Sequence, residues 1–139
     1  MNRAIRWLRI SYWTGAIVDT LAFLEMLFPG GLQAALGQSG PHITMEFRLA
    51  QAFGAPLMIG WTVLLLWADR KPMERRGVLA ITLCPVLVGL LIRGIVGANS
   101  GVFVGSTAVT AIAVPVVVIA LFSYSLLLAR GAPRATGIR

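Results

Sequence analysis

Charged residues are scarce in this chain. Lysine and arginine number 12, and aspartate and glutamate number 5, among 139 residues. Charged residues make up 12% of the sequence, whereas a typical soluble domain contains about 25%. Hydrophobic residues make up 58%. This composition excludes an ordinary soluble domain and indicates an integral membrane protein.

Histidine and cysteine are each present once, as His42 and Cys84. A single histidine excludes a bis-histidine haem and a histidine-rich zinc site, and a single cysteine excludes an intramolecular disulfide and a CxxC redox motif. Glycine-rich phosphate loops and the GxSxG and HExxH motifs are also missing. We therefore expect no metal and no cofactor. We interpret Cys84, which lies in an apolar run, as a small buried hydrophobic residue.

Four apolar runs are each long enough to cross a bilayer core of about 30 Å. The segments between them are short and rich in glycine, proline or charge, which end helices. The sequence therefore predicts an all-α fold, in which residues 1–139 form one domain, an integral membrane bundle of four transmembrane helices. The spans are expected at about residues 7–28, 47–67, 77–97 and 107–128.

Basic residues are distributed unequally between the two sides of the predicted bundle. If both termini and the loop between the second and third spans share one side, ten basic residues lie there, and only Arg48 and Arg93 lie on the other side. Because positively charged loops stay in the cytoplasm, the sequence predicts that both termini are cytoplasmic. The basic residues do not cluster on a soluble face, so we expect contact with membrane lipids and no nucleic-acid partner.

Two carboxylates, Asp19 and Glu25, interrupt the first apolar run. A charge inside a membrane needs a partner or a function. Asp19 shares a helical face with small residues such as Gly15 and Ala16, which indicates that this face packs against other helices. The ionisable residues outside the cytoplasmic segments all fall in the outer half of the predicted bundle: Asp19, Glu25, Glu46, Arg48 and Arg93.

Three acids accompany two bases in this outer half, so one carboxylate is left unpaired if each arginine pairs with an acid. We expect Arg93 to pair with an acid of the first span. Asp19 is the deepest acid, and we interpret it as the unpaired, proton-binding carboxylate. Gln51 lies one helical turn from Arg48 on the same face. No catalytic residue is identified, and the candidate ligand-binding or proton-binding residues are Asp19, Glu25, Glu46, Arg48, Gln51 and Arg93.

Glycine and proline predict local features of the second and third spans. Gly89, Arg93 and Gly97 follow a spacing of four residues, which predicts one face where the glycines let a neighbouring helix approach while Arg93 projects between them. Pro56 leaves the carbonyl of Ala52 without its helical amide donor, which predicts a kink in the second span.

Two classes of function are compatible with these residues. The first is a binding or transport protein whose outward-facing polar pocket accepts a small or amphipathic solute, with or without a proton. The second is a membrane enzyme acting on a lipid or isoprenoid substrate, with Asp19 or Glu25 as general acid or base and Arg93 stabilising an anion. A scaffold subunit with purely structural ion pairs is a third alternative. Each is compatible with a homo-oligomer or a larger membrane complex.

A resemblance covers part of the chain. Residues 47–76, including the run GWTVLLLWADRKPMERR at residues 60–76, resemble a set of small, uncharacterised bacterial four-span membrane proteins. The resemblance extends over about the first three predicted spans, and it implies the four-span fold and no activity. We expect a multi-pass protein of the cell (inner) membrane. The small multidrug-resistance transporters are similar in size and also have an acid in the first span, but Asp19 within Ile17-Val18-Asp19-Thr20 does not match their local pattern.

Overall fold

The computed structural model of the chain describes residues 3–28, 44–103 and 105–131, and His42 lies outside them. Within these ranges the chain is helical and contains no β-strand, which confirms the predicted all-α class. Three of the described helices are long and apolar enough to cross a membrane, which indicates a multi-pass membrane protein. They comprise Met45–Asp69, Gly77–Asn99 and Ser106–Gly131.

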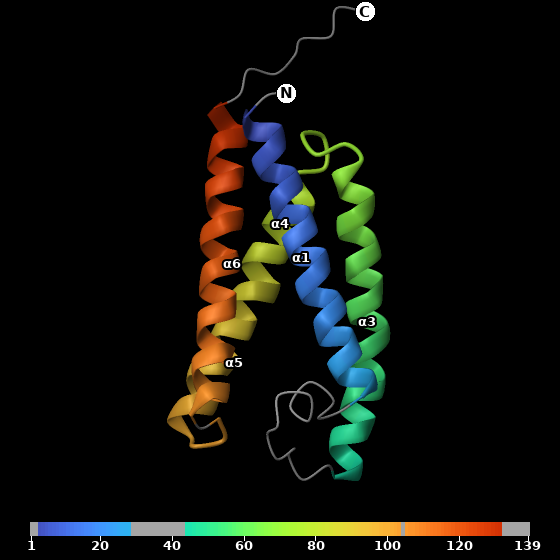
Figure 1. Cartoon of the computed structure of the whole chain (residues 1–139), viewed down its shortest axis with the longest axis vertical. Helices are drawn as coiled ribbons and strands as arrows, with labels where there is room; N and C mark the ends of the chain where they lie inside the picture. Colours follow the sequence, from blue (N-terminus) through green and yellow to red (C-terminus); the bar gives the residue numbers. More distant parts are fainter. Residues whose placement is uncertain (1–2, 29–43, 104, 132–139) are drawn as a thin grey trace, which may run out of the picture. The chain divides into compact units, whose positions relative to one another are not determined.

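Long helices make up most of the described chain (Figure 1). Helix α1 comprises Arg3–Leu27, α3 comprises Met45–Asp69, and α6 comprises Ser106–Gly131. Between α3 and α6 lies one continuous helical segment, which consists of α4 (Gly77–Ile81), the π-helical turn η1 (Thr82–Leu87) and α5 (Val88–Asn99). At 1.5 Å per residue, the 25 residues of α1 span about 38 Å.

Contacts divide the chain into two units. The first unit comprises Met1–Tyr12 and Ala68–Arg139, and the second comprises Trp13–Trp67. The first unit thus contains the start of α1 together with α4, η1, α5 and α6, and the second contains the rest of α1 and nearly all of α3. That residues 1–139 form a single domain stays a prediction.

A buried polar contact joins α1 to α6 in the first unit. The hydroxyl oxygens of Ser11 and Ser125 lie 2.5 Å apart, and both side chains are fully buried. The Ser125 hydroxyl also lies 3.1 Å from the backbone carbonyl oxygen of Trp7. Small residues that hydrogen-bond across helices are typical of membrane helix interfaces. The large side chains that are fully buried among the described residues of the first unit are Leu8, Tyr12, Leu79 and Phe122.

Helices α5 and α6 lie side by side in the first unit (Figure 1). A Cβ atom added at Gly94 would lie 2.5 Å from the backbone oxygen of Ala111 in α6, and one added at Gly97 would overlap the ring of Phe103. At Gly89 an added Cβ meets nothing described within 4 Å. The prediction that Gly89 admits a neighbouring helix is therefore wrong, and Gly94 allows the close approach of α6 instead.

The connection between α5 and α6 folds back on the end of α5. The amide of Phe103 donates a hydrogen bond to the carbonyl of Gly97, at an N···O distance of 3.0 Å. Gly101 and Gly105 have φ angles of 72° and 59°, in the left-handed region that side chains disfavour. These two glycines allow the chain to reverse direction within a few residues.

Prolines inside the helices have different local effects. Helix α3 continues through Pro56 and α6 continues through Pro115, whereas the helix around Pro85 widens into the π-helical turn η1. Cys84 lies in this turn and is exposed, so its predicted burial is wrong. An apolar run predicts a membrane environment, but it does not say which side chains face protein and which face lipid.

Candidate functional site

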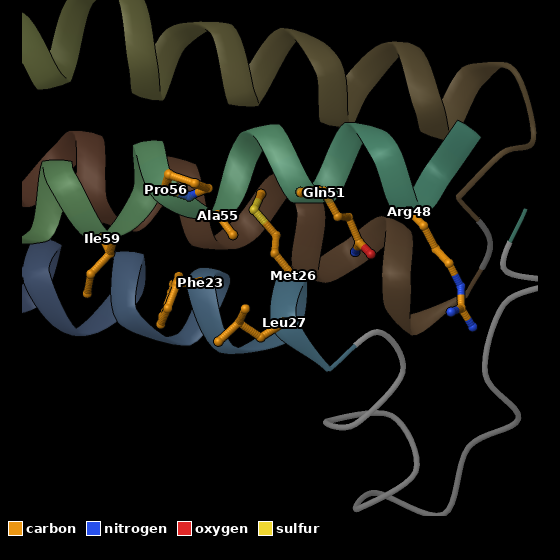
Figure 2. A pocket seen from close by; sticks show the side chains of 9 residues that line it. Phe23, Met26, Leu27, Arg48, Gln51, Ala55, Pro56 and Ile59 are labelled. Carbon is orange, nitrogen blue, oxygen red and sulfur yellow. The ribbon is translucent and has the colours of Figure 1, made fainter. Parts of the chain in front are cut away.

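The largest cavity described in the second unit is a groove of about 680 Å³ between α1 and α3 (Figure 2). Pockets for small molecules typically enclose about 300–1,000 Å³ and have apolar walls with a few polar groups. The groove matches this description in size and in chemistry. Its lining residues are Phe23, Met26, Leu27, Arg48, Gln51, Ala52, Ala55, Pro56 and Ile59.

Gly54 of α3 leaves room for a side chain of α1 beside the groove. A Cβ atom added at Gly54 would lie 3.0 Å from the sulfur of Met26, so the methionine occupies the space that a larger residue would fill. Figure 2 shows the Met26 side chain extending from α1 toward α3. Ala52 and Pro56 line the same groove, and proline has no amide hydrogen to offer the Ala52 carbonyl. This part of the groove wall thus combines close packing with a carbonyl that lacks its usual helical donor.

Gln51 is the polar residue whose surroundings are most unusual. The carbonyl oxygen of its side chain, Oε1, is buried and has no hydrogen-bond partner among the described residues. Most buried polar atoms in proteins have a partner, and the exceptions call for an explanation such as a ligand or an ordered water. Gln51 lines the groove, so a rotation of its side chain that turns Oε1 into the groove would offer an acceptor to a bound molecule.

Arg48 lies one turn before Gln51 in α3 and is exposed. Its side chain makes no hydrogen bond or ion pair with the described residues. In Figure 2 its guanidinium points away from the apolar residues of the groove. Glu46 is exposed in the first turn of α3 and does not line the groove. The groove therefore has a cationic end and an apolar interior.

Asp19 lies on the packed face of α1, as the sequence predicts. Ala16 on this face is 3% exposed, whereas Ile17 and Leu21 on the opposite face are 56% and 53% exposed. One carboxylate oxygen of Asp19, Oδ2, is buried and has no hydrogen-bond partner among the described residues. Asp19 does not line the groove, but it precedes the groove residue Phe23 by one helical turn.

The remaining candidates do not share this groove. Glu25 is half-buried in α1 and is not among the lining residues. Arg93 belongs to the first unit, where its guanidinium carbon lies 5.5 Å from the centroid of the Phe103 ring, at the distance of a cation–π contact. The expected pairing of Arg93 with an acid of the first span stays a prediction. Of the six candidate residues, the structure places Arg48 and Gln51 in one cavity.

The sequence analysis missed most of the apolar wall of the groove, although the spacing along the second span already places Ala55 on the face of Arg48 and Gln51. Ile59 and Ala55 extend the helical face that begins at Arg48 and Gln51, at spacings of three and four residues. That spacing could have identified the wall on α3. Which residues of α1 face this wall depends on how the two helices pack, and the structure places Phe23, Met26 and Leu27 there.

The arrangement suits reversible binding of an amphipathic molecule. A polar end with an arginine and a free acceptor can orient a head group, and the apolar interior can bury the rest of the ligand. In the described part of the chain, no group of three or more histidine, cysteine or acidic residues lies close enough to hold a metal ion. The chain matches no protein-family model, no curated protein and no solved structure.

Proposed function

We propose that the protein is a four-span protein of a bacterial inner membrane, with α1 as the fourth span and both termini in the cytoplasm. Three observations support this topology. Helix α1 is as long as α3, its arginines lie in its first turns, and the segment joining α3 to α4 contains Arg70, Lys71, Arg75 and Arg76. In this topology the end of α1 and the start of α3 lie on the outer side, so the groove opens outward.

We further propose that this groove binds or transports a small or amphipathic solute. The buried Oε1 of Gln51, which has no partner among the described residues, is the observation on which the proposal depends. Leaving a buried acceptor unpaired costs about 1–3 kcal/mol, and a donor on a bound solute would recover that free energy. Asp19, one turn from the groove, is the proposed proton-binding residue.

Binding fits the groove better than catalysis does. Among the described lining residues, Arg48 is the only ionisable side chain, so no carboxylate is in place to act as general acid or base on an occupant. We therefore favour a binding or transport function, and a homo-oligomer or larger complex stays a prediction.

Thiol labelling tests whether the groove opens outward. Replacing Cys84 by serine removes the single cysteine, and Gln51→Cys then places one thiol in the groove. A membrane-impermeant methanethiosulfonate sulfonate added to intact cells should label this variant. A control, Phe53→Cys, puts the thiol at a position that is 76% exposed on another face of α3, where lipid should protect it.

Two labelling outcomes would contradict the proposal. If Gln51→Cys is labelled only in inside-out vesicles, the groove opens to the cytoplasm and the topology is wrong. If it is labelled from neither side while its thiol reacts in detergent, the groove is closed to water and the solute-binding proposal fails. Protection of the labelled position by added solutes would then identify the class of ligand.

A further inference from the structure

A second cavity, of about 470 Å³, lies at the start of α1 in the first unit. Its lining residues are Arg3, Arg6, Trp7 and Ile10. Their spacing of three, four and seven residues places them on one face of the helix. The groove between α1 and α3 shares none of these residues.

The aromatic wall of this cavity is held in place by α6. The rings of Trp7 and Tyr124 pack edge to face, with centroids 4.9 Å apart and an interplanar angle of 87°. The Ser125 hydroxyl lies 3.1 Å from the carbonyl oxygen of Trp7, which fixes the backbone at the same point. Arg3 donates a hydrogen bond from Nη2 to the Tyr124 hydroxyl at 3.3 Å. The positions of one arginine and of the indole are thus set before any ligand arrives.

The cavity is cationic and has no acid in its lining. Arg3 and Arg6 are both exposed, and Arg6 makes no hydrogen bond or ion pair with the described residues. The next arginine along the helix, Arg9, differs because it pairs with Asp69 at an Nε–Oδ1 distance of 3.2 Å. The two cavity arginines therefore have no described counterion, and an anion is the complementary ligand.

The neighbouring side chains select the kind of anion. Indole rings prefer the interface between lipid and water, and arginines at that depth lie level with lipid phosphates. Ile10, one turn further along α1, is 44% exposed and offers an apolar surface beside the arginines. Inorganic phosphate could use the arginines but would gain nothing from Ile10 or from the apolar ring surface of Trp7. A phospholipid would use both parts of the cavity.

We infer that Arg3, Arg6 and Trp7 form a binding site for the phosphate group of an anionic phospholipid, with Ile10 beside the first carbons of its acyl chains. The inference requires only that this end of α1 lies at a membrane surface, and it does not depend on the solute groove. Basic cavities at the cytoplasmic ends of membrane helices are suited to anionic head groups.

Competition between two lipids tests the site. The full-length chain is exchanged into mixed micelles containing equal amounts of phosphatidylglycerol and phosphatidylcholine, and bound lipid is counted by native mass spectrometry. Each arginine near an anionic surface contributes about fivefold to affinity, so Arg3→Gln with Arg6→Gln should lower the preference for phosphatidylglycerol by more than about tenfold.

The chain offers a control with the same change of charge. Arg70→Gln with Lys71→Gln also removes two exposed basic residues from the first unit, and because neither residue lines the cavity it should lower the lipid preference clearly less than the Arg3 and Arg6 double variant does. Equal losses in the two double variants would overturn the site, because attraction to anionic lipid would then reflect net charge alone. Arg3→Lys with Arg6→Lys keeps the charge and should retain most of the preference, which separates lost binding from lost folding.

Competition with added phosphate shows whether the site binds a lipid phosphate group or a free phosphate ion. Added sodium phosphate should displace phosphatidylglycerol no better than sodium chloride at equal ionic strength. If phosphate displaces the lipid specifically, the ligand is a free phosphate and the lipid assignment is wrong. A Trp7→Ala variant should weaken phosphatidylglycerol binding, and unchanged binding in that variant would count against the lipid in the same way.

Discussion

Replacing Gly94 by alanine tests the packing of α5 on α6. The new methyl carbon would lie 2.5 Å from the backbone oxygen of Ala111 and 3.0 Å from its carbonyl carbon. Real Cβ atoms essentially never approach other heavy atoms within 3.0 Å, and the opposing atoms belong to backbone that cannot rotate away. The two helices must therefore separate. Overpacking of this kind costs about 1–3 kcal/mol.

Gly89→Ala is the matched control for this change. It makes the same substitution in the same helix, but its methyl group meets no described atom within 4 Å. Both variants gain the same helix propensity, up to about 1 kcal/mol, when glycine is removed. That gain cancels in the comparison, so Gly94→Ala should be less stable than Gly89→Ala by about 1–3 kcal/mol, which is the overpacking cost alone.

Reversible unfolding in mixed micelles measures the difference. Increasing the fraction of sodium dodecyl sulfate, with far-ultraviolet circular dichroism as the readout, gives the free energy of unfolding for each variant. If Gly94→Ala and Gly89→Ala unfold at the same detergent fraction, the close approach of α5 to Ala111 is refuted. The same assay applies to other contacts in the first unit.

Two further predictions concern polar groups inside the helices. Ser125→Ala removes the hydroxyl that lies 2.5 Å from the Ser11 hydroxyl and should lower the free energy of unfolding by roughly 1 kcal/mol. The control, Thr110→Ala at an exposed position, should leave the free energy of unfolding unchanged. Equal effects of the two substitutions would contradict the buried contact. Asp19→Asn should abolish the pH dependence of solute-induced currents recorded on a solid-supported membrane, and Glu25→Gln should preserve it. Identical pH profiles for wild type and Asp19→Asn would exclude Asp19 as the proton-binding residue.

The helices could be predicted from the sequence because a long apolar run is enough to indicate a membrane-spanning helix. Every predicted span overlaps a described helix, but the helices mostly extend further, as at Arg3 and Asp69. Hydropathy marks where a segment enters the hydrocarbon, whereas backbone hydrogen bonds continue into the polar interface. Hydropathy therefore identifies a membrane segment without locating the ends of its helix.

The packed face of a helix could be predicted from the sequence only where small residues and a charged residue indicate the same face. Small residues around Asp19 identified the packed side of α1 because they recur at spacings of three and four. In α5 the strict spacing of four from Gly89 to Gly97 was misleading. The packed face passes through Leu87 and Gly94, seven residues or about two turns apart, and both are buried. Arg93 is exposed beside this face, next to Phe103.

The groove could be predicted only in part because it belongs to two helices. The sequence identified Arg48 and Gln51 as neighbours on one face of α3. It could not tell which residues of α1 stand opposite, because the pairing of Met26 with Gly54 depends on how far one helix slides along the other. The sequence analysis therefore assigned residues such as Glu46 to one site because of their charge, whereas the groove contains only some of these candidates.

The π-helical turn at Thr82–Leu87 affects how the third apolar segment can change in length. The amide of Val88 bonds to the carbonyl of Leu83, five residues earlier, so this turn contains one more residue than an α-helical turn. Deleting one residue here would restore regular α-helical geometry locally. Because the wide turn absorbs the extra residue, the helical turns on its two sides should keep nearly the same angular register after the deletion. Leu79, which is fully buried, would then keep its packed position, so the turn lets the segment contain one more residue without changing which side chains face the protein.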